Sequence, residues 1–135
     1  MTYMLDTNIC IYAIKNKPQC IIDSLKAHTN DDICISSITY SELMHGVEKS
    51  KYVERNKIIL SLFLSNIRII DYDSKAGDEY GKIRVDLEQK GTPIGPFDML
   101  IAAHAKANNY ILVTNNTKEF ERVDGLKIEN WALEN

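Results

Sequence analysis

The sequence predicts an α/β fold in three layers, an α/β/α sandwich built on a mostly parallel sheet. Short apolar runs that suit buried strands alternate with stretches in which apolar residues recur at helical spacing, and the connections between them are short. The strand-like runs are continuously apolar, which is typical of parallel strands that helices cover on both faces.

In the first half of the chain, TYMLD is short, apolar and bounded by polar residues, so we expect a buried strand that ends at Asp6. A helical stretch follows, and Pro18 begins a second helical pattern. DDICIS, residues 31–36, predicts another strand. Helices are expected over residues 39–48 and 53–64, and the face predicted for the core in the first of these comprises Tyr40, Leu43, Met44 and Val47.

In the second half, IRIIDYD (67–73) predicts a third strand, and apolar residues then recur at helical spacing from Ala76 until Gly91 ends the helix. TPIGPFD (92–98) is expected to be a loop. The alanine-rich stretch that follows it predicts a helix over residues 99–109. YILVT (110–114) is the clearest strand, and LKIENW (126–131) predicts a weaker one.

The length and composition predict one domain that spans residues 1–135, without repeats or linkers. No apolar run approaches the roughly 20 residues of a membrane span, and the start of the chain lacks a basic segment followed by a long apolar one. We therefore expect a soluble cytoplasmic protein. Three cysteines without CxxC spacing, Cys10, Cys20 and Cys34, suit small core residues in a reducing compartment.

The charge balance argues against a broad basic surface for nucleic acid. The chain has 16 Lys and Arg against 19 Asp and Glu, which gives a net charge of −3. The densest basic segment is EKSKYVERNK (48–57), whose interleaved acids favour a solvated helix face.

Acidic and amide side chains follow two of the predicted strands. Asp6 ends the first, and YILVT leads to Thr114, Asn115 and Asn116, with Glu119 about one helical turn further on. In an open parallel sheet, ligands bind beyond the carboxyl ends of the strands, at a topological switch point. We therefore expect these side chains to meet on one rim.

Asp98 comes to this rim from a helix. Gly95 and Pro96 favour a helix start, which places Asp98 in the first turn, on the same face as Ile101, Ala102 and Ala105. A carboxylate at the edge of a core is costly to ionise unless a positive charge neutralises it. The nearest cation of that helix, Lys106, lies on another face, so a hard divalent cation is the natural candidate.

Each acid also has an ordinary structural interpretation. Asp6 could be only a helix N-cap, Asp98 a first-turn residue favoured by the helix dipole, and Glu119 the third residue of a capping box with Asn116. Glu42 lies opposite the predicted core face of its helix, so that an exposed position is expected for it alone. These interpretations do not explain why the acids should all lie on one rim of the sheet.

Four segments in register, MLDTN, SSITYSELMHG, PIGPFDMLIAAHA and LVTNNTKEF, resemble the PIN-domain ribonucleases, and more narrowly the VapC toxins of bacterial toxin-antitoxin pairs. The resemblance covers essentially the whole chain. It implies an endoribonuclease that leaves a 5′ phosphate and a 3′ hydroxyl, with Mg²⁺ as cofactor and Mn²⁺ as a substitute. It also implies a homodimer, inhibition by a cognate VapB-type antitoxin that places a basic side chain in the acidic pocket, and tRNA, initiator tRNA included, as substrate.

By the matching motifs, the catalytic acids implied by this resemblance are Asp6, Glu42, Asp98 and Glu119, of which Asp6, Asp98 and Glu119 would bind the metal. Many PIN domains have T-x-D in the last motif where this chain has TNN, so Asn116 can coordinate only through its carbonyl or hold a water. We expect four polar residues to hold the carboxylates in place, namely Thr7, Asn8, Thr114 and Asn116. Candidates for local RNA contacts are Lys15, Lys17, Lys49, Lys51 and Arg55, whose ordinary interpretation is a solvated surface.

Other classes fit the sequence less well. A receiver-like domain needs paired acids after its first strand and a Lys after its last, and a haloacid-dehalogenase-type phosphatase needs a second Asp two residues after the nucleophile. The chain also lacks GxGxxG and GxxxxGK[ST] loops for nucleotides. A catalytically inactive PIN scaffold that binds RNA or protein remains the alternative.

Overall fold

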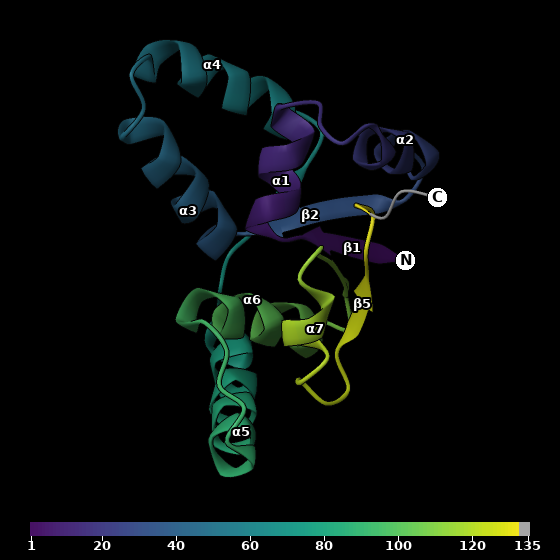
Figure 1. The fold of residues 1–135 in the computed structure, drawn as a ribbon, viewed down its shortest axis with the longest axis vertical. Helices are drawn as coiled ribbons and strands as arrows, with labels where there is room; N and C mark the ends of the chain where they lie inside the picture. The colour runs from purple at the N-terminus through teal and green to yellow at the C-terminus, as the bar shows by residue number, and fades with distance from the viewer. Residues whose placement is uncertain (133–135) are drawn as a thin grey trace.

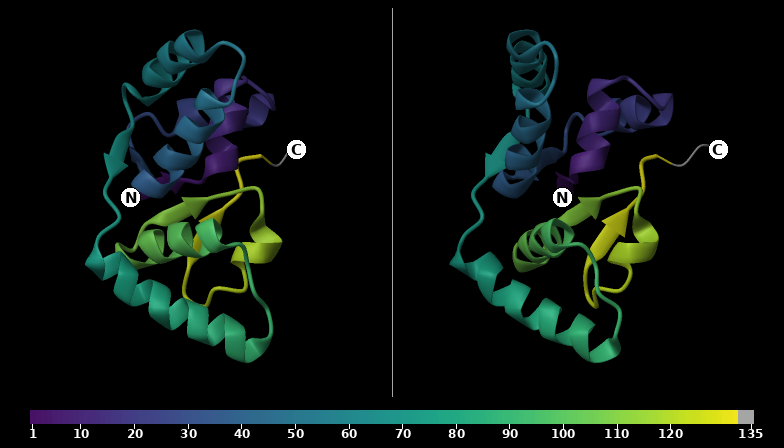
Figure 2. Two further views of the ribbon diagram at one scale, coloured as in Figure 1. Left: turned by 90° about the vertical axis from the view of Figure 1, so that its left-hand side faces the viewer. Right: turned by 60° about the vertical axis from the view of Figure 1, so that its left-hand side comes forward.

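A computed structural model describes residues 1–132 and places a five-stranded sheet between two layers of helices (Figures 1 and 2). The strands are β1 (Thr2–Leu5), β2 (Asp32–Ser36), β3 (Arg68–Ile70), β4 (Ile111–Val113) and β5 (Lys127–Glu129). The helices are α1 (Thr7–Ile14), α2 (Gln19–Ala27), α3 (Ser37–Glu48), α4 (Val53–Leu64), α5 (Ser74–Lys90), α6 (Pro96–Ala107) and α7 (Thr117–Phe120). Every strand pair is parallel, so the predicted fold class is confirmed.

The strand order β3-β2-β1-β4-β5 creates one switch point in the sheet. From β1 the chain proceeds outward through β2 to β3, whereas β4 returns to the other side of β1 and β5 lies beyond it. The connections after β1 and β4 therefore diverge, although the strands are neighbours, with Leu5 paired to Val113. A ligand site is expected beyond these two carboxyl ends.

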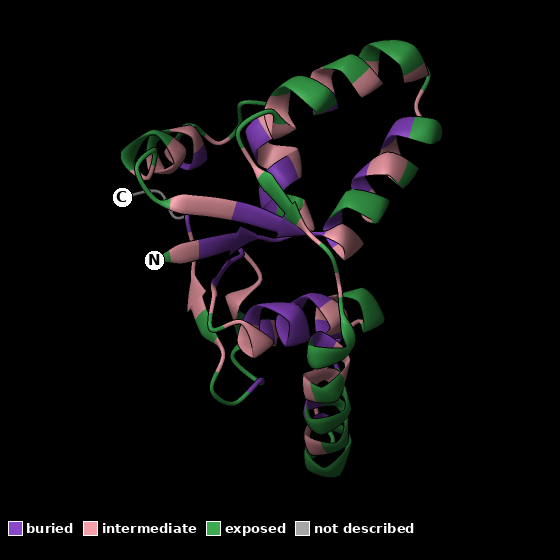
Figure 3. Ribbon diagram, turned by 180° about the vertical axis from the view of Figure 1, so that it is seen from behind, coloured by how far each residue is buried: buried purple, intermediate pink, exposed green. Residues whose placement is uncertain are grey.

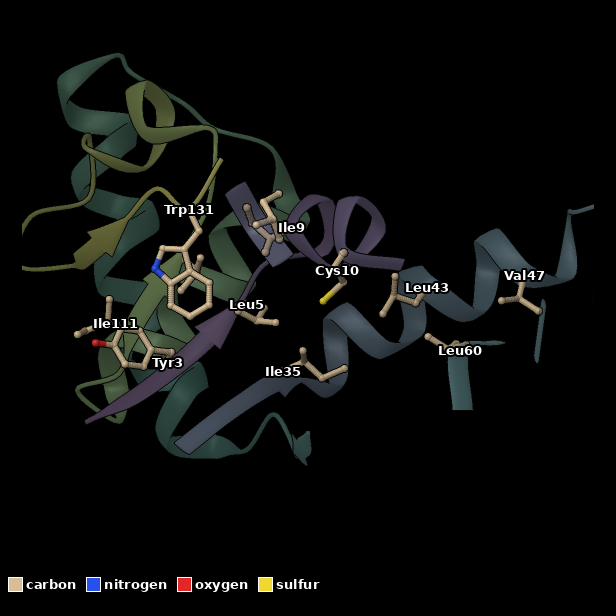
Figure 4. Packing of buried hydrophobic residues seen from close by; sticks show 13 residues of the cluster. Tyr3, Leu5, Ile9, Cys10, Ile35, Leu43, Val47, Leu60, Ile111 and Trp131 are labelled. Carbon is tan, nitrogen blue, oxygen red and sulfur yellow. The ribbon is translucent and has the colours of Figure 1, made fainter. Parts of the chain in front are cut away.

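Alternate residues of the strands supply two cores, one on each face of the sheet. Tyr3 and Leu5 pack into the core beneath α1, α2, α3 and α4, part of which is drawn in Figure 4. Met4 packs into the core on the opposite face, with residues of α5, α6 and α7. Figure 3 shows that α6 and the inner parts of the strands are buried, whereas much of α4 and α5 is exposed.

Several element boundaries differ from those expected. The expected loop over residues 92–98 ends at Gly95, because Pro96 is already the first residue of α6. The expected strands at 67–73, 110–114 and 126–131 shorten to β3, β4 and β5.

The predicted core face of α3 is wrong at Tyr40, which is 36% exposed, while Thr39 is fully buried. The reason is that α3 starts directly after β2, at Ser37, so Thr39, Leu43 and Val47 share the inward face at intervals of four residues.

Two smaller predictions also have an outcome. Cys10 and Cys34 are free and buried, and Cys20 is free and partly buried. In the segment 48–57, the Lys57 ammonium lies 3.2 Å from a carboxylate oxygen of Glu48 and 3.7 Å from one of Glu54, as expected of a solvated helix face.

Within residues 1–132, no helix has the length and apolar character needed to cross a membrane.

The end of α5 supplies a test of the fold. Gly91 has φ +66°, so Gly91→Ala should lower the free energy of unfolding by about 1 kcal/mol, measured by urea denaturation. Gly81 lies in the interior of the same helix with open space where a Cβ would stand, so Gly81→Ala should raise it by about 0.5–1 kcal/mol. Shifts of the same sign in both variants would contradict this helix end.

Candidate active site

Asp6 lies at the switch point, directly after β1, and is only 4% exposed. Its Oδ1 accepts a hydrogen bond of 2.9 Å from the backbone N–H of Ile9, so Asp6 is the N-cap of α1. Burial raises the pKa of Asp6 to about 6, against the opposing hydrogen bonds from Thr114 and Ile9, and the charge of Glu42 raises it further. Asp6 is thus both a helix cap and a member of an acidic cluster.

Glu42 reaches this cluster from α3. Thr7, the first residue of α1, donates a hydrogen bond of 2.7 Å from its hydroxyl to Oε1 of Glu42. The same hydroxyl lies 3.4 Å from that of the buried Thr39. Glu42 is therefore partly buried, and the expectation of an exposed position is wrong because Thr7 turns this face of α3 toward the site.

Asp98 comes from the opposite layer of helices, in the first turn of α6 as predicted. It is half-buried, and its pKa is raised to about 7, first by burial and then by the charge of Glu119. The carboxylates of Asp6 and Glu42 add smaller increases to the pKa. The pKa of Asp98 thus responds to the charges of the other three acids, which come from both layers of helices.

Glu119, in α7, is partly buried and bound to its surroundings through both carboxylate oxygens. Oε1 accepts a hydrogen bond of 2.9 Å from the backbone N–H of Gly95, and Oε2 accepts one from the side-chain amide of Asn116. Burial would raise the pKa of Glu119, but these bonds, a hydrogen bond with Asp98 and the charge of Arg122 lower it overall. The capping-box interpretation is wrong, since Asn116 offers its side chain to Glu119 and its backbone N–H to Thr114.

The residues expected to hold the carboxylates divide into two groups. Thr7 donates a hydrogen bond to Glu42, and the side chain of Asn116 donates one to Glu119. The hydroxyl of the buried Thr114 donates to Asp6 and accepts a hydrogen bond of 3.0 Å from the backbone N–H of Asn116. Asn8 differs, because it is exposed and its side chain makes no hydrogen bond within residues 1–132. The role expected for Asn8 has no support in this geometry.

Gly95 is a site residue that the sequence analysis did not identify as one. A Cβ there would stand 3.3 Å from Oδ2 of Asp98 and 3.9 Å from Oε1 of Glu119, so a side chain would press on both acids. Its backbone N–H also holds Glu119. The glycine between Ile94 and Pro96 in TPIGPFD was the available signal, although it equally suits a helix start.

The cluster has little positive charge near it. None of its four acids forms an ion pair within residues 1–132, and the nearest influence is that of Arg122, whose guanidinium donates to the carbonyl of Pro93 over 2.9 Å. The described residues also contain no group of three Asp, Glu, His or Cys side chains gathered closely enough to form a metal cage. The donors that the cluster offers are carboxylate oxygens, which are the ligands that hard divalent cations take, and such ions can keep bound waters in place of further protein ligands.

Comparison with known proteins decides the family, because the PIN domain model matches residues 3–126. The chain belongs to the PIN-domain family. Its curated PIN-domain relatives include the tRNA(fMet)-specific endonuclease VapC of Shigella flexneri, 48% identical over 98% of this chain and 99% of the relative. Ribonuclease VapC2 of Rickettsia felis is 52% identical over 97% of this chain and 98% of that protein.

Solved structures of PIN-domain proteins have the same fold as this chain. VapBC2 of Rickettsia felis bound to a DNA fragment from its promoter aligns with a TM-score of 0.92 at 51% identity, over 97% of this chain and 99% of that one. DNA-bound VapBC of Salmonella typhimurium aligns with a TM-score of 0.91 at 47% identity, over 97% of this chain and 98% of that one.

Asp6→Asn tests the charge of the cluster in the metal-free protein. At pH 8 it should raise the free energy of unfolding by roughly 1–3 kcal/mol, because Asn keeps the N-cap bond and removes a buried charge. The pKa of Asp6 is about 6 in the folded protein against 3.8 ordinarily, so the destabilisation that Asp6 contributes is lost as the pH falls from about 7 to 4. The advantage of Asn should therefore shrink over this range, measured by urea denaturation with EDTA at pH 8 and pH 5.

The control is Asp73→Asn, which alters an exposed N-cap of α5 with the same kind of bond, 3.0 Å from the N–H of Ala76. Its effect on stability should be small and equal at the two pH values. A loss of stability in Asp6→Asn at pH 8 would leave only the helix-cap role for Asp6.

Proposed function

We propose that the chain is a Mg²⁺-dependent endoribonuclease toxin that cleaves tRNA, initiator tRNA in particular, and is neutralised by a VapB-type antitoxin. The observation that carries this proposal is the cluster of Asp6, Glu42, Asp98 and Glu119 at the switch point, with two pKa values raised to about 6 and about 7. The endonuclease relative specific for tRNA(fMet) suggests the substrate.

The residues assigned to the metal are Asp6, Asp98 and Glu119. Both oxygens of Glu119 already accept hydrogen bonds, but each carboxylate oxygen has a second lone pair. When bound, Mg²⁺ supplies the positive charge that lets an RNA phosphodiester enter this acidic site, and it lowers the pKa of a coordinated water. Mn²⁺ should substitute, because it prefers the same oxygen ligands.

The chain's own residues supply positioning and proton transfer. Thr7 fixes the carboxylate of Glu42, and Thr114 and Ile9 N–H fix that of Asp6. Asp98 and Glu42 are the two candidates to accept a proton from the attacking water. Attack of that water on phosphorus breaks the bond to the 3′ oxygen, which takes up a proton to become the 3′ hydroxyl, and leaves a 5′ phosphate on the other fragment.

An apolar groove of about 550 Å³ beside Glu42 supports the antitoxin part of the proposal. It lies between α1, α3 and α4, and its apolar lining includes Ile11, Ile14, Leu43, Val47, Ile59 and Leu60. An amphipathic antitoxin helix would bury its apolar face here, and a basic side chain beside it could bind the acidic pocket through Glu42. The VapBC structures of the relatives contain toxin and antitoxin together.

Assembly and location complete the proposal. We propose a single PIN domain over residues 1–135 that acts in the cytoplasm as a homodimer. Exposed apolar side chains on α4 and the edge strand β3 support a contact between copies, with Ile58 63%, Leu62 70% and Ile69 43% exposed.

Asp98→Asn tests the activity. It should lower the rate of initiator tRNA cleavage on the order of 10²–10⁴-fold, because the amide can neither accept the proton nor hold the cation with a charge. EDTA should abolish wild-type cleavage, and added Mg²⁺ or Mn²⁺ should restore it, as measured by gel analysis of the RNA.

Asp78→Asn, which removes an exposed carboxylate from α5, is the matched control and should cleave like the wild type. Undiminished cleavage by Asp98→Asn, or cleavage that needs no metal, would contradict the proposal. A wild-type protein inactive with both metals would be the inactive scaffold.

Gly46→Gln tests the groove. Gly46 lines it, and no atom lies within 4 Å of where its Cβ would stand, so the longer side chain should occupy the groove and weaken antitoxin binding at least tenfold. Gly77→Gln makes the same change in α5, also into open space, and should bind antitoxin normally. Both variants should cleave RNA, and equal antitoxin affinities in a binding titration would exclude the groove.

A further inference from the structure

His104 joins the two helix layers at a point away from the acidic cluster. It lies in α6 and is fully buried, and its Nδ1 is 2.7 Å from the hydroxyl oxygen of the equally buried Ser36. Its Nε2 is buried and has no hydrogen-bond partner within residues 1–132. The pair connects segments 68 residues apart in sequence.

Ser36 serves two elements at once. It ends β2 and is the N-cap of α3, where its hydroxyl oxygen accepts a bond of 3.1 Å from the N–H of Ile38. Its own proton is then available to His104. Burial lowers the pKa of His104 against the opposing influences of Asp73 and Asp71, so the ring is neutral near pH 7 and has an acceptor nitrogen.

The ring of His104 is also held from the side. The ring of Tyr72 meets it edge-on, with 5.5 Å between centroids and 77° between planes. Because a closely packed buried side chain cannot move without loss of packing energy, a shift of α3 should move His104 and with it α6.

Each member of the pair lies on a helix that also carries an acid. His104 is six residues from Asp98 along α6, and Ser36 is six residues from Glu42 along α3. Six residues of helix span about 9 Å. The helices α3 and α6 contact each other directly. A shift at the pair would therefore change the separation of Glu42 and Asp98.

We propose that Ser36 and His104 are positioning residues, whose hydrogen bond fixes α6, and with it the metal-binding carboxylate of Asp98, relative to α3 and the carboxylate of Glu42. This inference rests on the proposed metal-dependent function. Both partners of the bond are fully buried and out of reach of RNA, so its loss should change catalysis and metal affinity while leaving the affinity for tRNA unchanged.

The first test compares two neighbouring hydroxyls. Ser36→Ala should lower kcat for tRNA cleavage about ten- to hundredfold with KM nearly unchanged, since small misplacements of positioned groups cost on that order. It should also raise the Mn²⁺ concentration for the half-maximal shift in melting temperature several-fold, measured without RNA. Ser37→Ala removes a hydroxyl that accepts from Tyr72 N–H at 2.9 Å and does not bind α6, so its Mn²⁺ response should match the wild type.

The second test replaces His104 by Asn and by Leu, two side chains that branch at the same carbon. His104→Asn keeps a hydrogen-bonding atom near the position of Nδ1, whereas His104→Leu has none. His104→Asn loses volume and His104→Leu leaves the buried hydroxyl of Ser36 without its partner, so both should lower the melting temperature, but only His104→Leu should weaken the Mn²⁺ response and kcat as Ser36→Ala does. In the double variant of Ser36→Ala with His104→Leu, the loss should be no greater than in either single variant.

The outcomes separate the two proposals. A wild-type Mn²⁺ response in Ser36→Ala and His104→Leu, or equal losses in Ser36→Ala and Ser37→Ala, would make the bond merely structural and overturn the inference. A Mn²⁺ response that depends on Ser36, in a protein that cleaves no tRNA, would overturn the proposed function and leave the positioning role intact.

Discussion

The burial of carboxylates beside one another is the constraint around which this molecule is arranged. Asp6 and Asp98 have raised pKa values, and no ion pair within residues 1–132 relieves either of them. Holding such charges together weakens the fold, so the supporting hydrogen bonds must come from neutral donors. The donors are Ile9 N–H, Gly95 N–H and the hydroxyls of Thr7 and Thr114. They hold the oxygens in place without neutralising them, which leaves the charge available to a cation.

The sequence predicted the sheet and two of the acids because these depend on local pattern. Asp6 follows an apolar run, and Asp98 follows Gly95 and Pro96 at a helix start, so both could be placed from neighbouring residues. Parallel strands then require the carboxyl ends to meet on one edge. Glu42 and Glu119 were identified as site residues only through the family resemblance. From the local pattern alone, Glu42 was expected to be exposed and Glu119 to belong to a capping box.

The remaining features depend on contacts between distant parts of the chain. Glu42 turns inward because Thr7 holds it, 35 residues away, and Glu119 binds Gly95 across 24 residues. The phase of α3 was misjudged because its first residue directly follows β2, which moved the buried position from Tyr40 to Thr39. Such pairings are set by how helices pack on the sheet, and a single sequence contains no local signal for them.

The acids come equally from the two layers. Asp6 and Glu42 belong to α1 and α3 on one face of the sheet, and Asp98 and Glu119 to α6 and α7 on the other. The width of the metal site is therefore a property of the packing between layers. Within one layer, a hydrogen bond such as that from Thr7 to Glu42 can form whatever the distance to the other layer. Between the layers, the pairing of β1 with β4 holds one side of the gap, and the proposed role of the buried bond between Ser36 and His104 is to hold the other. The groove beside Glu42 is lined by residues of the first layer alone, so the proposed antitoxin helix would dock on that layer and reach the second only through the basic side chain in the acidic pocket.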